Sequence, residues 1–182
     1  MFNIFKKTPD VSCRWVQPAI RAAVENDISP QLFVALILNE SSGDPLATRW
    51  ERRFYIRYIA DKPLDQLTRT NVRELDHYED QMFRLSLAYS WGLCQIMGVV
   101  AFEHGFRGRN LWELLDVETN VKLGAEIYAH KRNLVRQKNP SANDAERDRL
   151  TLLAYNGGGD AEYPNRVMKR LQAAAALVTK CG

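Results

Sequence analysis

The chain has 182 residues, of which 46% are apolar and 10% aromatic, enough to bury a core of single-domain size. This composition excludes a disordered chain and a miniprotein held together by disulfides. The 25 basic and 22 acidic side chains leave a net charge of only +3, which does not indicate a nucleic-acid-binding protein. Mild basicity suits a polyanionic target such as a cell wall, although many proteins without such a partner carry the same charge.

Residues near the N-terminus are in the wrong order for a secretory signal. A mostly apolar run, Met1-Phe-Asn-Ile-Phe5, precedes Lys6 and Lys7, whereas a signal peptide has its positive charges first and a longer apolar region. No stretch of about 18 apolar residues lacks a charge, so we expect no transmembrane helix and no stable membrane insertion. We expect a chain made in the cytoplasm, with residues 1–13 as an N-terminal extension.

The residue types that bind metals or form disulfides are few. Cys13, Cys94 and Cys181 are an odd number at wide spacing, so we interpret them as three reduced thiols, two of them buried. None of the three histidines lies in a ligand or nucleophile motif, and no Gly-rich phosphate loop follows a predicted strand. We therefore expect no metal and no cofactor.

Few helix breakers, with 10 Gly and 7 Pro, together with many Leu and Ala, predict an all-α fold. No repeat or linker divides residues 1–182, so we expect one domain. A turn is expected at Ser90-Trp-Gly92 and a loop at Gly157-Gly-Gly159. Periodicity and capping signals predict helices at 14–26, 31–40, 50–59, 72–89, 94–103, 111–115, 117–137, 144–155 and 165–178.

The second of these helices is apolar almost all round, which is typical of a helix buried at the centre of a domain. Ser29 is its expected N-cap, Pro30 its first residue, and Gly43-Asp-Pro45 its end. Glu40 then lies in its last turn, where burial and the negative helix terminus both raise the pKa of a carboxyl group. A carboxylic acid protonated near neutral pH can cleave a glycosidic bond by general acid catalysis. Alternatively, Glu40 simply begins a solvated loop.

The predicted helix 50–59 carries four aromatic side chains with arginines between them. A core stripe with a solvated basic face explains this pattern better than a sugar-stacking surface. The aromatic residues are Trp50, Phe54, Tyr55 and Tyr58.

Three short motifs follow one another in a helical setting: Glu40-Ser-Ser-Gly-Asp-Pro45, Gly92-Leu-Cys-Gln-Ile-Met97 and Ala154-Tyr-Asn-Gly157. In this order they resemble the motifs of the lysozyme-like lytic transglycosylases, the soluble lytic murein transglycosylase family. The resemblance runs from about residue 15 to 171 and includes Asn120 with Gly124 and a final Tyr163-Pro-Asn-Arg-Val167. It implies an all-α, lysozyme-like (goose-type) domain in a phage-associated enzyme.

The resemblance also assigns roles to residues. It makes Glu40 the single catalytic acid and base, with Ser41 as its neighbour at the helix end. The other implied substrate-binding residues lie in or beside the two later motifs. Ser90 would lie near the acetamido groups, and Gln95 and the main chain at Met97 would line the sugar groove. Tyr155 would bond or orient Glu40, Asn156 would support that loop, and Tyr163 is the last implied residue. For Gln95 and Asn156, capping helices and holding the turn is an alternative role, and both roles can apply together.

Two features depart from the family pattern. Cys94 stands where the family usually has methionine, and both residues suit a buried apolar position. Residues of about 46–90 form an insertion that we expect to be one wall of the cleft. Within it, Arg49-Trp50-Glu51 resembles an Arg-Phe-Glu element of phage-associated wall hydrolases.

The implied reaction cleaves the β-1,4 bond between N-acetylmuramic acid (MurNAc) and N-acetylglucosamine (GlcNAc) and forms 1,6-anhydroMurNAc. A muramidase that hydrolyses the same bond is the alternative, and it needs a second carboxylate. Glu51 is the first candidate, ahead of Asp44 and Asp61, although an exposed salt bridge to nearby arginines explains Glu51 better. A non-catalytic glycan-binding or tail structural module fits the intact motifs least well.

The expected partner is the glycan strand of peptidoglycan, and phage tail or lysis proteins are further candidates. We expect a monomer that acts on the cell wall or periplasm after release, or as part of a virion. A phage source is the simplest interpretation of a wall enzyme without a signal peptide.

Overall fold

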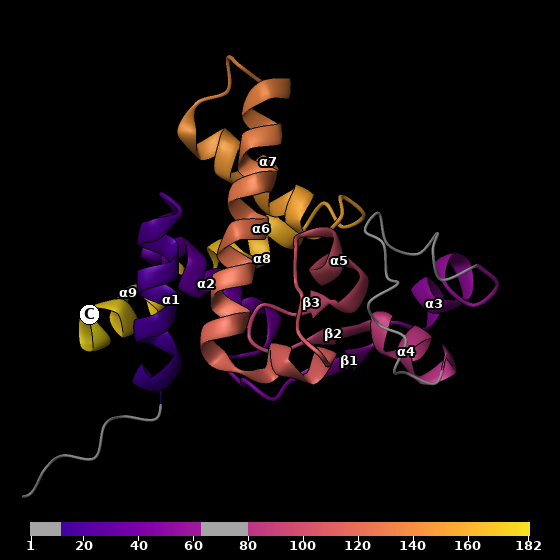
Figure 1. Ribbon diagram of the computed structural model, residues 1–182. Helices are drawn as coiled ribbons and strands as arrows, with labels where there is room; N and C mark the ends of the chain where they lie inside the picture. Colours follow the sequence, from indigo (N-terminus) through magenta and orange to yellow (C-terminus); the bar gives the residue numbers. More distant parts are fainter. Residues whose placement is uncertain (1–11, 63–79) are drawn as a thin grey trace, which may run out of the picture.

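The computed structural model describes residues 12–62 and 80–182, where the protein is mainly helical with one small sheet (Figure 1). The all-α expectation is thus confirmed, with a minor β component. Predicted features within residues 1–11 and 63–79 lie outside the described residues. The elements in chain order are α1 (Cys13–Glu25), α2 (Pro30–Glu40), β1 (Thr48–Trp50), α3 (Arg52–Tyr58), α4 (Asp80–Leu87), β2 (Tyr89–Trp91), β3 (Ile96–Met97), α5 (Gly98–Glu103), the 3₁₀ helix η3 (Leu111–Leu115), α6 (Val117–Lys138), α7 (Asp144–Tyr155), α8 (Tyr163–Met168) and α9 (Leu171–Cys181).

Most predicted helices are present, but four predictions need correction. The predicted helix 50–59 begins only at Arg52, because Trp50 belongs to β1, and the predicted helix 94–103 begins at Gly98 after β3. The predicted helix 72–89 lies partly outside the described residues, and its described part is α4, which begins at Asp80. The last predicted helix, 165–178, is two helices separated at Lys169 and Arg170. The predicted turn at residue 90 is the middle of β2.

The sheet is antiparallel, in the order β1-β2-β3, and it explains the first two errors. Arg49 pairs with Ser90, and Ser90 pairs in turn with Met97. These partners are about 40 and 7 residues apart in the chain, so helical periodicity within a short window could not reveal the pairing. A strand forms here because its hydrogen-bond partner is supplied by tertiary structure.

Side chains alternate between the two faces of a strand, so this sheet has one aromatic and one polar face. Trp50 and Tyr89 are cross-strand partners with ring centroids 5.2 Å apart, and Trp91 follows on the same face, 5.7 Å from Tyr89. The opposite face carries Arg49 and Ser90. Of the four aromatic residues predicted as a core stripe, Trp50, Phe54 and Tyr55 are partly buried against the core, whereas Tyr58 is 41% exposed.

Helix α2 is the centre of the fold. Its run from Leu32 to Ile37 is at most 5% exposed, and α1, α8 and α9 pack around it. The predicted cap is confirmed, since Ser29 Oγ accepts a hydrogen bond from the Leu32 N–H (3.4 Å) and Pro30 is the first helical residue. Because its apolar surface is covered on several sides, α2 has a fixed position and places Glu40 at a defined point.

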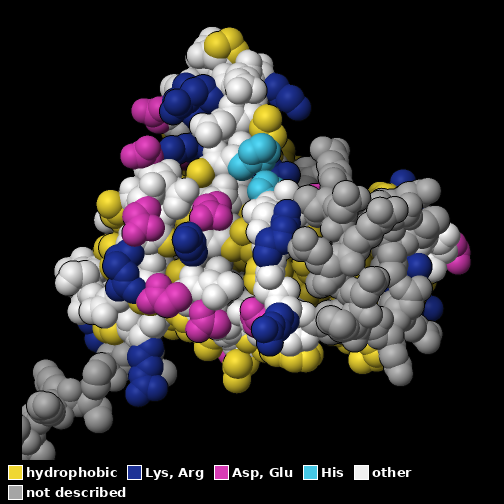
Figure 2. Space-filling model, viewed as in Figure 1, with side chains coloured by type: hydrophobic (Ala, Val, Ile, Leu, Met, Phe, Trp, Pro, Cys, Tyr) yellow, Lys and Arg dark blue, Asp and Glu magenta, His cyan; other side chains and the backbone are white. Residues whose placement is uncertain are grey.

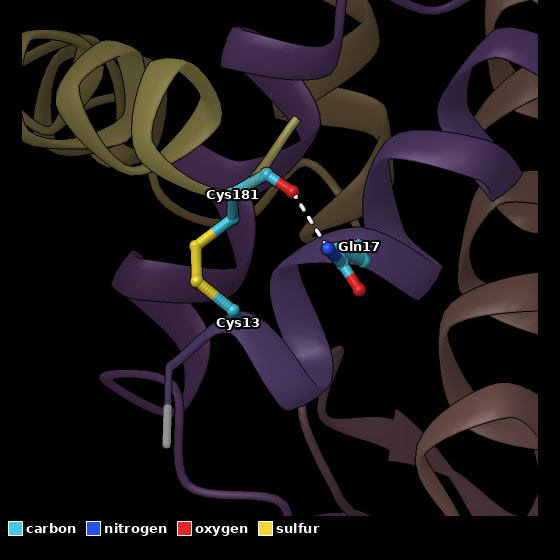
Figure 3. Close-up of a disulfide and its surroundings, with 3 residues drawn as sticks. All are labelled: Cys13, Gln17 and Cys181. Atoms are coloured by element: carbon cyan, nitrogen blue, oxygen red, sulfur yellow. Dashed lines mark hydrogen bonds between the residues drawn. A yellow bond between two sulfur atoms is a disulfide. The ribbon is translucent and has the colours of Figure 1, made fainter. Parts of the chain in front are cut away.

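The expectation of three reduced thiols is wrong, because Cys13 and Cys181 form a disulfide (Figure 3). Helices α1 and α9 lie side by side, which brings the two Cα atoms to 5.2 Å although 168 residues separate them in the chain. Gln17 Nε2 donates a hydrogen bond to the Cys181 carbonyl oxygen (3.0 Å) beside the bridge. Cys94 is a buried free thiol, as expected.

No helix within residues 12–62 and 80–182 has the length and apolar character needed to cross a membrane. Basic and acidic side chains are interspersed over the described part of the face in Figure 2. The described part of this face therefore lacks the continuous basic patch that a nucleic-acid-binding surface carries.

The disulfide closes a very long loop, so its reduction should lower stability. We expect dithiothreitol, or the double substitution Cys13→Ser with Cys181→Ser, to lower the melting temperature by about 10 °C, because a cross-link over such a loop stabilises by roughly 2–5 kcal/mol. Calorimetry with and without reductant measures the shift. The double variant is the control and should not respond to reductant, whereas an unchanged melting temperature of the reduced wild type would contradict the bridge.

Candidate active site

Glu40 is the last residue of α2, and its half-buried carboxyl group is bonded from the other end of the chain. The Tyr163 hydroxyl, at the start of α8, donates a hydrogen bond to Glu40 Oε1. Tyr163 is only 2% exposed, so its ring is fixed by packing of α8 against α2. The acid and its donor therefore form one rigid unit although they lie 123 positions apart.

The pKa of Glu40 is raised, as the sequence predicted, and burial is the largest cause. The Tyr163 hydrogen bond, the Arg49 guanidinium, Asn39 and Arg166 act in the opposite direction without cancelling the effect of burial. Burial and the Glu40 charge in turn raise the pKa of Tyr163, so that this phenol stays a hydrogen-bond donor. The site thus holds a carboxyl group that keeps its proton to a higher pH than a solvent-exposed glutamate does.

Ser41 and Gly43 end α2 and begin the next loop. Ser41 Oγ donates to the Ile37 carbonyl oxygen and accepts from the Gly43 N–H, both at 3.2 Å. Gly43 has φ +83°, and a Cβ there would lie 2.8 Å from the Trp15 ring, so only glycine fits. The Ser41 hydroxyl therefore holds the helix end that carries Glu40.

Gln95 holds the turn after β2, which confirms its predicted structural role. Its Nε2 donates to the carbonyl oxygens of Ala47 and Gly92, both at 3.0 Å, and so joins this turn to the loop before β1. Gly92 has φ +68°, and a Cβ there would lie 2.5 Å from the Leu114 carbonyl oxygen. The turn therefore has little freedom to move.

Asn120 on α6 fixes the same turn from inside the protein. It is 1% exposed, and its Oδ1 accepts from the Cys94 N–H (2.8 Å). Its Nδ2 donates to the carbonyl oxygens of Trp91 (2.9 Å) and Leu114 (2.7 Å). One buried side chain thus satisfies three main-chain groups, which is how a sharp turn is tolerated in a protein core.

Gly124 on α6 faces Cys94, the cysteine that departs from the family's turn motif. A Cβ at Gly124 would lie 2.5 Å from Cys94 Sγ, so α6 approaches the turn closely only because residue 124 is glycine. Cys94 is completely buried, and burial is the main cause that raises the pKa of its thiol. Cys94 is therefore a packing residue, as the sequence suggested.

Tyr155, which was expected to bond or orient Glu40, does not supply the hydrogen bond to this carboxyl group. The Tyr155 hydroxyl donates instead to the Cys94 carbonyl oxygen (2.9 Å), and Tyr163 supplies the donor to Glu40. Tyr155 still lies near the acid, because the Glu40 charge is one of the causes that raise its pKa, after burial and Cys94. Asn156 is exposed and caps the C-terminus of α7 through its N–H.

Ser90 and Glu51 meet Arg49 on the polar face of the sheet. Arg49 Nε donates to Glu51 Oε1 (2.5 Å), which confirms the salt-bridge interpretation of Glu51, and Ser90 Oγ donates to the same oxygen (3.3 Å). Ser90 is only 1% exposed, so its hydroxyl serves this network and not an open surface. The other carboxylate candidates, Asp44 and Asp61, are exposed.

A comparison with protein-family models decides the assignment. The model described as the Transglycosylase SLT domain matches residues 17–174. The chain belongs to this family. Comparisons with curated proteins and with solved structures found no match. Members of the SLT family are peptidoglycan lytic transglycosylases, which are lyases, so the chain is an enzyme of this class with a lysozyme-like fold.

Two arginines near the acid of this SLT transglycosylase were missed as site residues. The sequence placed Arg49 on a solvated basic face and gave Arg166 no role beyond its place in the motif Tyr163-Pro-Asn-Arg-Val167. The alternation of aromatic and polar side chains through Trp50 and Glu51 was a signal for a strand, and it would have placed Arg49 on the polar face. Arg166 lies one turn after Tyr163 on α8, where its guanidinium bonds Asp160 and stacks 5.8 Å from the centre of the Tyr163 ring.

The SLT transglycosylase also has an apolar cavity of about 320 Å³ on the aromatic side of the sheet. Tyr89, Trp91, Phe102 and Trp112 are among its lining residues, and Glu40 is not.

Loss of the Asn120 side chain should destabilise the SLT transglycosylase strongly. Asn120→Ala leaves one buried N–H and two buried carbonyl groups without partners, so we expect a loss of about 2–4 kcal/mol in the free energy of unfolding. Urea denaturation measures this change. Asn133→Ala on the exposed face of the same helix is the matched control and should change stability by less than about 0.5 kcal/mol. Equal effects of the two substitutions would contradict the role of the Asn120 network.

Proposed function

We propose that this enzyme cleaves the β-1,4 bond between MurNAc and GlcNAc in peptidoglycan and closes a 1,6-anhydro ring on MurNAc, with Glu40 as its only catalytic carboxyl group. The observation that carries this proposal is the half-buried Glu40, whose pKa is raised and whose Oε1 is held by Tyr163. A proton donor near neutral pH is what cleavage of a glycosidic bond needs first.

In the first step, the Glu40 proton passes to the oxygen of the glycosidic bond, and the bond between that oxygen and the anomeric carbon breaks. The 2-acetamido group of MurNAc helps to stabilise positive charge at the anomeric carbon. In the second step, the Glu40 carboxylate takes the proton of the MurNAc 6-hydroxyl, whose oxygen bonds to the anomeric carbon. Glu40 is protonated again at the end, and no water is consumed.

Tyr163 supports both states of the acid. Its hydroxyl occupies Oε1, which leaves Oε2 to carry the proton. When the carboxyl group becomes a carboxylate, the same hydrogen bond becomes charge-assisted and therefore stronger. Tyr163 thus limits the cost of forming a buried charge between the two steps.

The remaining predicted residues would define the sugar groove. Gln95 uses its Nε2 to hold the turn, and its Oε1 has no partner within the described residues, so it is available to a sugar hydroxyl or amide. The main chain at Met97 follows in β3, and Tyr155, Asn156 and Ser41 hold the loops around Glu40.

A single carboxyl group is favoured over the muramidase alternative. Glu51 Oε1 already accepts bonds from Arg49 and Ser90, so this carboxylate is engaged by the sheet. A hydrolase would need it to position a water molecule.

Residues of about 46–90 remain our proposed cleft wall, within one domain of 182 residues. We propose a monomer that acts on the wall after release from the cytoplasm, in a phage or virion setting. The disulfide supports a place of action outside a reducing compartment.

Substitution of Glu40 tests the reaction directly. We expect Glu40→Gln to lower the rate of peptidoglycan cleavage by at least about 1,000-fold, because the proton donor is lost. Mass spectrometry of digested sacculi should show 1,6-anhydroMurNAc ends with the wild type. Glu51→Gln is the control for the alternative and should keep the anhydro products. Reducing ends in place of anhydro ends would contradict the transglycosylase reaction.

The Tyr163 hydrogen bond should be visible in the pH dependence. Activity requires protonated Glu40, so it falls as the pH rises through the pKa of this group. Tyr163 lowers that pKa, so Tyr163→Phe should move the alkaline limb of the pH–rate profile to higher pH. It should also slow the reaction about 10-fold or more, because a hydrogen bond to a charged group is lost.

Tyr155→Phe is the matched control for this experiment. Its hydroxyl bonds Cys94 and not Glu40, so the alkaline limb should stay within error of its wild-type position. A limb that stays in place in Tyr163→Phe, or moves to lower pH, would refute the proposed role of Tyr163.

A further inference from the structure

One nitrogen of the Arg49 guanidinium is bonded within the protein, and the other two are available to a ligand. Its Nε donates to Glu51 Oε1 (2.5 Å), and its two terminal nitrogens have no hydrogen-bond partner within the described residues. The side chain is 63% exposed. Two adjacent N–H groups of a guanidinium match the two oxygens of a carboxylate, so this end of Arg49 is a donor pair for an anionic ligand.

The anchor of Arg49 is itself fixed. Arg49 and Glu51 are two positions apart and point to the same face of the sheet, and Glu51 N–H donates to the Ala88 carbonyl oxygen (2.9 Å) across the β1–β2 ladder. The Glu51 side chain also accepts from the buried Ser90 hydroxyl (3.3 Å). A long flexible side chain is thereby held in place before any ligand arrives, which lowers the entropy lost on binding.

Arg49 is also close to the proposed acid. The loop that leaves Glu40 leads directly into β1, and Gln95 Nε2 donates to the Ala47 carbonyl oxygen of that loop (3.0 Å), which holds the start of β1 beside the turn after β2. The Arg49 charge is also among the causes that lower the pKa of Glu40. Arg166 reaches Glu40 as well, but its guanidinium is bonded to Asp160 and lies over the Tyr163 ring. Of these two arginines beside Glu40, Arg49 is therefore the one with an open pair of donors.

We propose that Arg49 is a specificity residue that binds a carboxylate of the peptidoglycan strand beside the bond at Glu40. This proposal rests on the proposed function. Peptidoglycan offers a carboxylate from two sources: the lactyl group of MurNAc where the stem peptide is absent, and the acidic residues of the stem peptide where it is present. A neutral glycan such as a GlcNAc oligomer offers none, so Arg49 would favour wall strands over chitin-like chains.

The test measures binding in a Glu40→Gln background, where the ligand is not consumed. Isothermal titration uses three glycans of similar length: MurNAc-GlcNAc oligomers with free lactyl groups, the same oligomers with stem peptides, and a GlcNAc oligomer. We expect Arg49→Gln to weaken binding of at least one carboxylate-bearing ligand about 10- to 100-fold and binding of the GlcNAc oligomer less than about 2-fold. The ligand that shows the loss identifies the source of the carboxylate.

Two further variants guard against a merely structural effect. Arg49→Lys keeps the charge but not the paired donors, so it should recover only part of the binding. Arg136→Gln removes an exposed arginine at the end of α6 and is the control for net charge, with unchanged affinity for all three ligands. Melting temperatures close to that of the background protein show that each variant is folded.

Equal losses for neutral and carboxylate-bearing glycans, or no loss for any, would overturn the carboxylate site while leaving the proposed function intact. Failure of the Glu40→Gln protein to bind all three glycans would refute the proposed function and this site with it.

Discussion

A carboxyl group at the end of a buried apolar helix is the constraint on which the site depends. The central run of helix α2 is covered on several sides, so the helix end that carries Glu40 has a fixed position. Burial raises the pKa of this group, and the Tyr163 hydroxyl provides the polar contact that makes its position tolerable. Tyr163 begins α8, which leads directly into α9, and α9 is packed on α2 and bridged to α1 by Cys13–Cys181. The two described ends of the chain thus meet around the helix that carries the acid.

A second set of constraints positions the surface beside Glu40. Asn120 holds the turn after β2 from within the core, and Gln95 joins that turn to the loop that leaves Glu40. The sheet between them has a partly buried aromatic face, which lines the apolar cavity, and a polar face that carries Arg49. Because these bonds come from buried or half-buried groups, the proposed groove is rigid before substrate binds, which favours precise placement of a sugar bond against the acid.

The electrostatics of the site balance two opposing demands. The proposed general acid must keep its proton until the glycosidic bond is cleaved, which a raised pKa favours, and must then become a carboxylate for the proposed second step. Tyr163, Arg49 and Arg166 make that charged state accessible without cancelling the effect of burial. Arg49 lowers the pKa of Glu40 and still has two terminal nitrogens available to a ligand. One residue therefore affects the proposed acid and would also bind wall carboxylates.

Sequence alone determined the features that depend on local order. The apolar run and Ser29-Pro30 specify α2 and its cap, Glu40 at its end follows from the Gly43-Asp-Pro45 stop, and the three motifs indicate the family. Tertiary structure decided the rest, because each remaining feature joins residues distant in the chain. The strand at Trp50 exists only through pairing with Tyr89, the donor to Glu40 is Tyr163 and not Tyr155 because of how α8 packs, and Cys13 meets Cys181 because α1 and α9 are neighbours. Periodicity within a window reports which face of an element is buried, but it does not report what lies against that face.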